Sequence, residues 1–275
     1  GGQWLGMQSG GILYVQPSRP LTQVIPIGVD DVILKMLPLD HTMILAGGRS
    51  GVYIYDTHKQ RIVETIDTGY MACSDIAKDS KGRIWISSLK GLQCYDNGEL
   101  LKYERSEIDG LMHHHIRFTY PLSDGRMLLC NMIHHLGYLD INKKHFTLLN
   151  EKIPELERYR TIIAACPTHR DDEVVVCTQN GLFILNVNTN KIRTIDAVKK
   201  YNRYTRKINC AIRDHKGRIW IGTQNGLLLM QKDEVRRIAE DDGLSNTCIR
   251  SLVEDSHGSI WVGTSNGINR IYAEG

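Results

Sequence analysis

The 275-residue sequence has no long apolar run. The longest uninterrupted one, Ile162 to Cys166, is far shorter than the roughly 20 residues that a membrane-spanning helix needs. The start of the chain has no basic segment followed by an apolar one, as a secretory signal peptide would. Charge is nearly balanced, with 34 basic and 31 acidic residues and a net charge of +3, which argues against a surface dedicated to nucleic acid.

Paired cysteine motifs are also absent. The seven cysteines form no C-x-x-C pair and no metal-finger spacing, and an odd number leaves at least one of them unpaired. We expect them to be small buried apolar residues, because free cysteine is among the most buried residue types. Cysteine usage therefore does not decide the redox compartment.

A repeat fills the sequence instead. Its clearest copy is RIWIGTQNGLLLM from Arg218, in which an apolar strand, a polar turn ending in Gly and a second apolar strand follow one another. The glycines that open the second of these strands are Gly10, Gly51, Gly91, Gly137, Gly181, Gly226 and Gly267, at spacings of 41, 40, 46, 44, 45 and 41 residues. A period just above forty, filled with short strands, is typical of β-propeller blades.

The tryptophans share the register of this repeat. All four, Trp4, Trp85, Trp220 and Trp261, lie six residues before the glycine of their repeat. We predict that they lie on the second strand of a blade and pack in its interior. An aromatic cage for a ligand is the alternative, but a cage would not recur at regular spacing along the chain.

Turn motifs complete the predicted blade. DSKG (79–82), DHKG (214–217) and DSHG (255–258) predict a tight turn in which Asp bonds the backbone two residues on and Gly adopts a positive φ. Each blade is then a four-stranded antiparallel meander whose innermost strand precedes this turn. The chain begins on a second strand and stops on a third, so we expect incomplete first and last blades and a segment of a longer polypeptide.

The predicted fold is therefore all-β, a seven-bladed propeller that occupies residues 1–275 as one domain. The predicted blades cover residues 1–24, 25–66, 67–106, 107–150, 151–198, 199–241 and 242–275.

The units DGLSNTCIRSLVEDSHGSIWVGTSNGINRIY and CAIRDHKGRIWIGTQNGLLLM closely resemble the two-component-regulator propeller repeat. The resemblance implies the extracytoplasmic, periplasmic sensor region of a hybrid two-component system, with a histidine kinase elsewhere in the polypeptide. It further implies tandem propellers, a β-sandwich, a membrane span outside this chain, and oligosaccharide ligands. The repeat specifies blades and not a ligand, so it does not settle the function.

Histidines concentrate in the fourth repeat. We expect the loops that lead into the first strands and the turns between second and third strands to share one face of the propeller. On that face His113, His114 and His115 would meet His134 and His135. We considered a metal site, a rim that binds a sugar or an anion, and a solvated cluster. Asp109 is the one acid close by in sequence, which disfavours metal.

Neighbouring loops add aromatic and basic residues to this predicted rim. The ligand-binding candidates are His113, His115, His134, His135, Tyr159, Arg160, Tyr204, Arg206, Tyr70 and Arg49, with Lys90 and Lys207 nearby. Aromatic rings stack on sugars and guanidinium groups bind carboxylate or sulfate, whereas a scattered basic surface is the plainer alternative.

We therefore predict a non-enzymatic sensor with no catalytic residue, no metal and no cofactor. Its expected partners are an oligosaccharide and further domains of the same polypeptide, with a homodimer left open and no nucleic acid. One alternative is a propeller lyase or hydrolase that uses a His and a metal. The other is a protein-interaction propeller of the WD type, which is disfavoured because no G-H…W-D pairing recurs.

Overall fold

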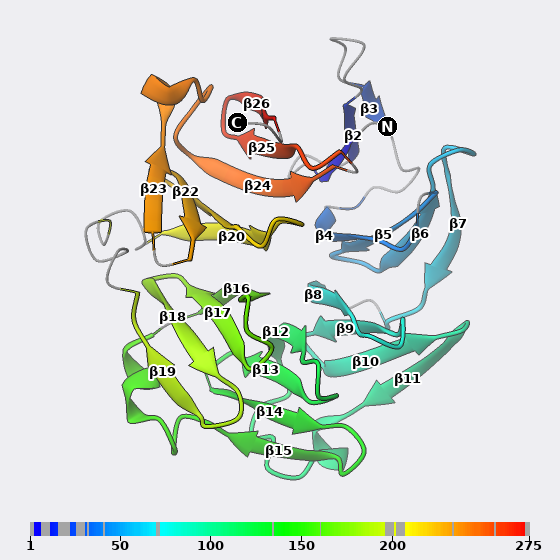
Figure 1. Ribbon diagram of the computed structural model, residues 1–275. Helices are drawn as coiled ribbons and strands as arrows, with labels where there is room; N and C mark the ends of the chain where they lie inside the picture. Colours follow the sequence, from blue (N-terminus) through cyan, green and yellow to red (C-terminus); the bar gives the residue numbers. More distant parts are fainter. Residues whose placement is uncertain are drawn as a thin grey trace. The chain divides into compact units, whose positions relative to one another are not determined.

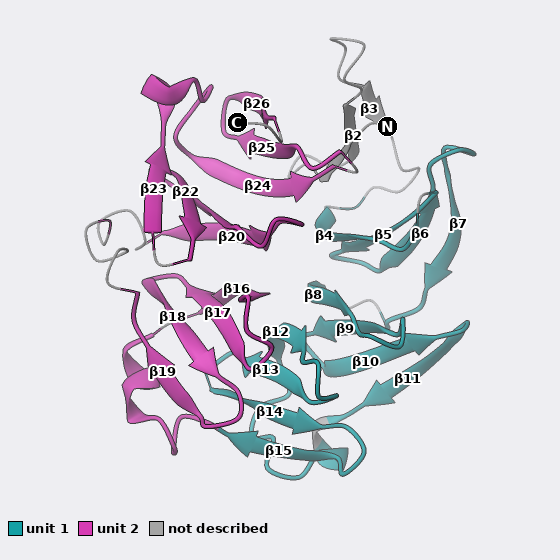
Figure 2. Cartoon of the chain, viewed as in Figure 1, with its two compact units in different colours: residues 1–148 teal, residues 149–275 magenta. Residues whose placement is uncertain are grey.

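A computed structural model describes residues 3–6, 12–15, 23–25, 31, 33–40, 42–69, 72–133, 135–159, 161–195, 201, 207–232, 234–255 and 257–272. In this part of the chain the secondary structure is antiparallel strand with three short 3-10 helices. The chain divides into two compact units, residues 1–148 and 149–275 (Figure 2).

The first unit holds four sheets whose strands follow one another in chain order (Figure 1). The elements are β1 (Gln3–Gly6), β2 (Ile12–Val15) and β3 (Gln23–Ile25); β4 (Ile33–Pro38), β5 (Met43–Gly48), β6 (Val52–Asp56) and β7 (Arg61–Ile66); β8 (Cys73–Lys78), β9 (Ile84–Ser88), β10 (Gly91–Asp96) and β11 (Glu99–Tyr103); helix η1 (Arg105–Glu107); and β12 (Ile116–Pro121), β13 (Met127–Asn131), β14 (Leu136–Asp140) and β15 (His145–Leu148).

The second unit holds three sheets of the same kind. The elements are η2 (Pro154–Arg158), β16 (Ile162–Pro167), β17 (Glu173–Thr178), β18 (Gly181–Asn186) and β19 (Lys191–Arg193); β20 (Ile208–Arg213), β21 (Ile219–Thr223), β22 (Gly226–Gln231) and β23 (Glu234–Ile238); and η3 (Glu240–Asp242), β24 (Ile249–Glu254), β25 (Ile260–Thr264) and β26 (Gly267–Ile271).

The prediction of all-β, four-stranded antiparallel meanders is confirmed, but the predicted number of seven blades is too high. Among the described residues five sheets have four strands, whereas the first (β1–β3) and the last (β24–β26) have three. Incomplete first and last blades were predicted, and the reason is visible in the strand order: β1 is the second strand of its repeat and β26 is the third strand of its own. The count of seven includes these two incomplete sheets, which is why it is too high. That residues 1–275 form one domain stays a prediction.

In the third, sixth and seventh repeats an aspartate fixes the turn between first and second strands. In the third repeat Asp79 Oδ1 accepts hydrogen bonds from the backbone N–H of Lys81 at 2.9 Å and of Arg83 at 3.0 Å. Gly82 has a φ of 84°, as predicted, because the turn needs a conformation that other residues adopt only with strain. The carboxylate thus takes over the hydrogen bonding of the turn backbone.

The same carboxylate holds the tryptophan of the repeat. The indole N–H donates to Asp Oδ2 from Trp85 to Asp79 at 2.9 Å, from Trp220 to Asp214 at 2.8 Å, and from Trp261 to Asp255 at 2.9 Å. An arginine guanidinium covers each of these rings at 5.1 to 5.2 Å from the centroid. All three indoles are at most 5% exposed, so the predicted packing inside the blades is confirmed for them. Trp4 lies in a segment whose side chains are not described.

Within each unit, neighbouring sheets pack through their first strands. In the first unit β4 contacts β8, and β8 contacts β12. The buried carboxylate of Asp75 on β8 joins all three: its Oδ1 lies 3.3 Å from Lys35 Nζ on β4, and its Oδ2 accepts a hydrogen bond from the backbone N–H of Thr119 on β12 at 3.0 Å. One side chain therefore links three consecutive sheets.

Candidate functional site

Backbone hydrogen bonds define one end of the sheets. The residue that opens the turn between second and third strands donates its N–H to the carbonyl just before the first strand of the same sheet. The pairs are Met132 to His115 at 3.0 Å, Gln179 to Thr161 at 2.9 Å, Gln224 to Lys207 at 3.0 Å and Ser265 to Cys248 at 2.9 Å. The prediction that lead-in loops and second-to-third-strand turns lie together is therefore confirmed in each of these sheets. We call this the loop end.

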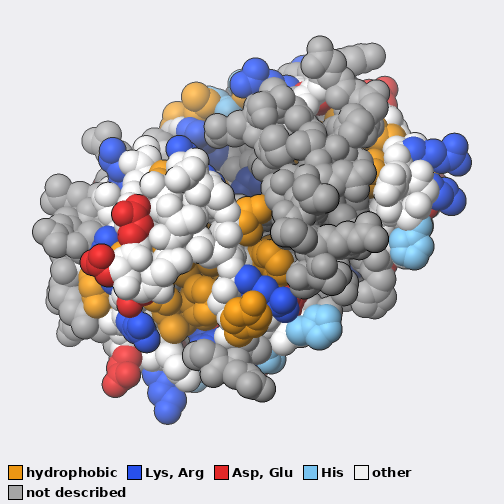
Figure 3. All heavy atoms as spheres, turned by 90° about the horizontal axis from the view of Figure 1, so that it is seen from above, with side chains coloured by type: hydrophobic (Ala, Val, Ile, Leu, Met, Phe, Trp, Pro, Cys, Tyr) orange, Lys and Arg blue, Asp and Glu red, His pale blue; other side chains and the backbone are white. Residues whose placement is uncertain are grey.

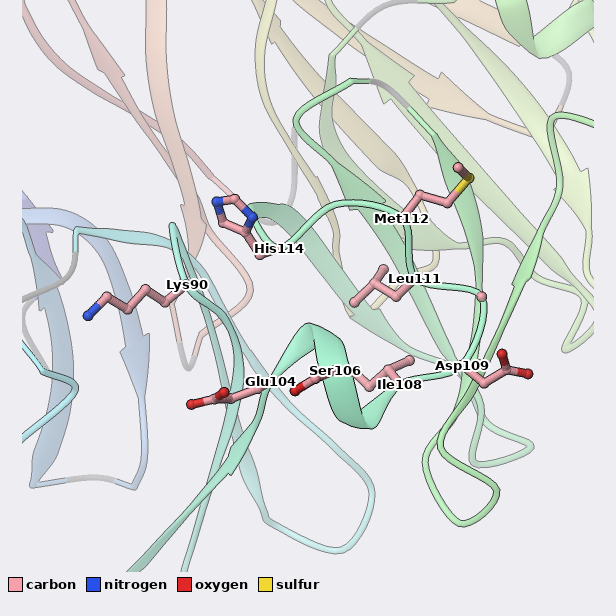
Figure 4. Close-up of a pocket in the computed structure, with 9 residues that line it drawn as sticks. Lys90, Glu104, Ser106, Ile108, Asp109, Leu111, Met112 and His114 are labelled. Atoms are coloured by element: carbon pink, nitrogen blue, oxygen red, sulfur yellow. The ribbon is translucent and has the colours of Figure 1, made fainter.

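A depression of about 920 Å³ opens at the loop end of the third and fourth sheets, within the first unit (Figure 4). Its lining residues are Lys90, Glu104, Ser106, Ile108, Asp109, Gly110, Leu111, Met112 and His114. Lys90 comes from the turn between β9 and β10, and the others come from the segment that joins β11 to β12. We call it the 90–114 pocket. Figure 4 shows Lys90 and Glu104 on one side of it and Asp109 on the other.

Buried apolar side chains and backbone hydrogen bonds hold the wall of the 90–114 pocket in place. Ile108 and Leu111 are buried in the core between the third and fourth sheets, at 3% and 4% exposure. Asp109 pairs with β15: its N–H donates to Lys144 O at 2.9 Å, and its carbonyl accepts from Phe146 N–H at 2.8 Å. The neighbouring Gly110 has a φ of 77°, and a Cβ there would lie 2.5 Å from a backbone oxygen, so no larger residue fits without displacement. The pocket thus has a fixed apolar floor beneath exposed charged groups.

The histidines next to this pocket are ordered by mutual contacts. The rings of His113 and His114 stack with centroids 4.8 Å apart. The backbone N–H of His115 donates to His113 Nδ1 at 3.2 Å, and the ring of His115 lies between Ser74 and Met132, with Nε2 3.2 Å from Ser74 Oγ and Nδ1 2.8 Å from Met132 Sδ. Burial and then the nearby positive charge of Arg117 lower the pKa of His115 below its ordinary value. Both effects favour the neutral form of the ring.

The other predicted binding residues fare unequally. His135 belongs to the same turn as Met132, which contacts the His113–His115 loop, and the backbone N–H of His135 donates to Asn131 Oδ1 at 3.0 Å. Arg49 is exposed at the turn between β5 and β6, its backbone N–H held by Asp31 at 2.9 Å. Tyr159 belongs to the second unit, and its ring packs on the ring of Phe183 with centroids 4.5 Å apart. This part of the ring therefore makes a packing contact within the protein.

Five predicted residues, His134, Arg160, Tyr204, Arg206 and Tyr70, lie outside the described residues. Conversely, sequence reasoning did not select Glu104, Ser106, Met112 and Met132. Their one sequence signal is position, because each lies in a segment that leads into a first strand or in a turn between second and third strands.

The described part of the chain shows no metal site of the usual kind. It contains no group of three or more His, Cys, Asp and Glu side chains arranged to hold a metal ion. On the face seen in Figure 3, basic, acidic, histidine and apolar side chains are interspersed among the described residues. This mixed surface agrees with the nearly balanced charge of the sequence.

Stacked antiparallel meanders with a repeated Trp and Gly define a β-propeller fold. Residues 205–225 and 243–266 match the family described as two component regulator propeller. The prediction of two-component-regulator propeller repeats is therefore confirmed. No curated protein matches the sequence.

Solved structures with the same fold include extracellular domains of signalling proteins. One is that of BT3049 from B. thetaiotaomicron, named as a hybrid two component system, with a TM-score of 0.78 and 17% identity over 99% of this chain. Another is that of BT4673 from the same organism, similarly named, with a TM-score of 0.78 and 20% identity over 98% of this chain. This chain spans 38% and 36% of those two chains.

An enzyme shares the fold as well. Streptogramin B lyase has a TM-score of 0.65 and 12% identity over 98% of this chain and 89% of the lyase chain. Identities this low establish the fold and not the activity. No helix in the described part of this chain has the length and apolar character needed to cross a bilayer.

Proposed function

We propose that this chain is a ligand-sensing propeller from the extracytoplasmic, periplasmic region of a hybrid two-component signalling protein. In this proposal it binds an oligosaccharide and relays binding to a histidine kinase outside the chain, and it is not itself an enzyme. The observation that carries the proposal is the pair of regulator propeller repeats at residues 205–225 and 243–266. Two structural neighbours named as extracellular domains of hybrid two component systems support it.

The 90–114 pocket is the binding site that we propose within the first unit. Lys90, Glu104, Ser106 and Asp109 offer donors and acceptors of both charges around an apolar floor, a combination that suits a polyhydroxylated ligand with apolar ring faces. The His114 imidazole supplies a flat face at the rim. Binding residues placed on loops of a rigid scaffold are the usual arrangement in such sites.

A ligand transmits a signal only when its affinity differs between two states of the protein, typically by about 1–3 kcal/mol. The lead-in segment of the pocket continues directly into β12, the first strand of the fourth sheet. We propose that occupation of the pocket biases the arrangement of this segment. The relay to a kinase rests on the same proposal.

The test is a thermal-shift and calorimetric screen of the chain against neutral and acidic oligosaccharides. A sugar that raises the unfolding temperature is then titrated into K90A and E104Q, which should weaken binding at least tenfold. K81A is the matched control, because Lys81 is an exposed lysine of the same sheet at the turn between β8 and β9, the other end of β9 from Lys90. Equal affinity of K90A, E104Q and K81A would remove the 90–114 pocket from the proposal.

The lyase alternative is separated by two further measurements on the same sample. Metal analysis together with product detection for each sugar that binds would show bound metal and turnover for a lyase. Binding without turnover supports the sensor. Failure of every oligosaccharide to shift the unfolding temperature would contradict the proposed ligand class.

A further inference from the structure

Arg117 is a basic residue whose guanidinium group has no partner among the described residues. It is exposed and is the second residue of β12, close to the loop end of the fourth sheet. The pairing of β12 with β13 shifts register between Ile116 and Phe118, as in a β-bulge with Arg117 as the extra residue. Such bulges re-aim a side chain out of the regular ladder and are common beside binding sites.

The last sheet shows what occupies an arginine at this position. Arg250 is the corresponding residue of β24, at the same register shift, and its Nε donates to Ser265 Oγ at 2.9 Å. Ser265 opens the turn between second and third strands, as Met132 does in the fourth sheet. The sulfur of Met132 is a weak acceptor and already lies 2.8 Å from His115 Nδ1. Arg117 is therefore left with its donors free for a ligand.

The charged groups near Arg117 are basic. Burial lowers the pKa of His115, and the positive charges of Arg117, His113 and His114 lower it further. A carboxylate close to the His115 ring would act in the opposite direction. An anionic group of a ligand at this position would therefore meet hydrogen-bond donors and positive charge that none of these residues neutralises.

Arg117 adjoins the 90–114 pocket through the histidines. His114, which acts on the same histidine ring as Arg117, lines the pocket. Figure 4 shows His114 and Lys90 on the side of the pocket opposite Asp109. The other acid of the lining, Glu104, shares its side of the pocket with Lys90, whose charge offsets that of the carboxylate. A ligand that extends past His114 can thus bring an acidic group to Arg117.

We propose that Arg117 is a specificity-determining residue and binds the carboxylate or sulfate group of an acidic oligosaccharide. A guanidinium group pairs with either anion through two parallel hydrogen bonds, which a neutral hydroxyl group does not match. This inference rests on the proposed oligosaccharide-sensing function and narrows its ligand to acidic sugars. It adds to the site a residue outside the lining of the 90–114 pocket.

The experiment is a calorimetric titration of the chain with short uronate-containing and sulfated oligosaccharides. Each one is paired with its carboxyl-reduced or desulfated form, so that the two members differ only in the acidic group. We expect the wild-type chain to bind the acidic member of a pair about tenfold more tightly than the neutral member. R117Q should bind both members with the affinity that the wild-type chain has for the neutral one. Whether the uronates or the sulfated sugars show the preference tells carboxylate from sulfate.

The matched control is R61Q. Arg61 is an exposed arginine of the same unit at the start of β7, and the change removes the same charge. R61Q should keep the preference of the wild-type chain for the acidic member. A second readout reports direct contact: the side-chain Nε–H signal of Arg117 in ¹⁵N-labelled protein, assigned by its loss in R117Q, should shift with the acidic member and not with the neutral one.

The inference is overturned if R117Q, folded by circular dichroism, keeps the preference for the acidic member, or if R61Q loses it as well. It is also overturned, with the proposed function intact, if neutral oligosaccharides bind and no acidic one binds more tightly. If no oligosaccharide of either kind binds, the proposed ligand class fails and this inference fails with it.

Discussion

The two ends of the strands are held by different chemistry. In the third, sixth and seventh repeats, a single aspartate at the turn between first and second strands binds turn backbone, indole and arginine, as Asp214 does with Trp220 and Arg218. At the loop end, backbone pairs such as Gln224 N–H to Lys207 O hold the loops together, helped by the Thr or Ser that ends the second strand, such as Thr223. Side chains therefore carry the stability at one end and are left available for binding at the other.

The largest effect should come from W220A. It removes a ring that is 1% exposed and leaves Asp214 without its indole donor. We expect a loss of about 3–5 kcal/mol in the free energy of unfolding, measured by chemical denaturation. W220F should cost less, because it keeps most of the buried surface. Equal losses for the two variants would show that burial contributes little at this position.

The second-largest loss of stability should come from changing the carboxylate of Asp214. Burial raises the pKa of Asp214, but hydrogen bonds from Trp220 and Arg218 outweigh it and hold the pKa below its ordinary value of 3.8. D214N replaces charged hydrogen bonds by neutral ones and should cost about 1.5–3 kcal/mol.

This difference should depend on pH. A lowered pKa in the folded state stabilises the fold above the ordinary value of 3.8, and that stability is lost as the pH falls through the folded value. The unfolding free energies of wild type and D214N should therefore approach each other below about pH 4. A constant difference between pH 7 and pH 3 would contradict this account of the Asp214 carboxylate.

A smaller effect should come from the turn glycine. Gly82 has a φ of 84°, and a Cβ there would meet nothing within 4 Å, so G82A tests backbone strain alone. We expect a loss of about 1–2 kcal/mol on chemical denaturation. G82N is the matched variant and should lose less, because Asn tolerates this conformation. If Ala and Asn cost the same, strain is not the reason for Gly at this turn.

The smallest effect should come from the loop end. Lys90 and His114 are exposed and lie at the other end of the strands from the hydrogen bonds between indole and aspartate. K90A and H114A should change the free energy of unfolding by no more than about 0.5 kcal/mol. Losses as large as that of G82A would break the contrast between the two ends of the strands.

Much of the fold could be predicted because its causes are local and repeated. The shared spacing of Trp220 and Gly226 with their counterparts predicts the strands and turns, and the structure has them there. The bond from the indole to Asp214 was not predicted, although an Asp six residues before a Trp recurs in three repeats. The incomplete first and last blades could also be predicted, because the sequence begins on a second strand and stops on a third, and among the described residues those two sheets have three strands each.

The candidate site was harder to predict from sequence. The His113–His115 loop contacts the following turn through His115 and Met132, whereas the convergence of these histidines with His134 and His135 stays a prediction. The 90–114 pocket was not predicted as a whole, because Lys90 meets Glu104 and Ser106 only through the packing of the third sheet against the segment that follows it. Such proximity depends on tertiary structure and leaves no spacing in the sequence.

Asp75 has a consequence for how the first unit opens. Its carboxylate binds the amine of Lys35 on β4 and the N–H of Thr119 on β12, so detaching either of these two strands removes one of the two partners of a buried carboxylate. The inner strands β4, β8 and β12 should then exchange their amide hydrogens as one cooperative block and not sheet by sheet. In D75N, hydrogen–deuterium exchange should separate into independent steps.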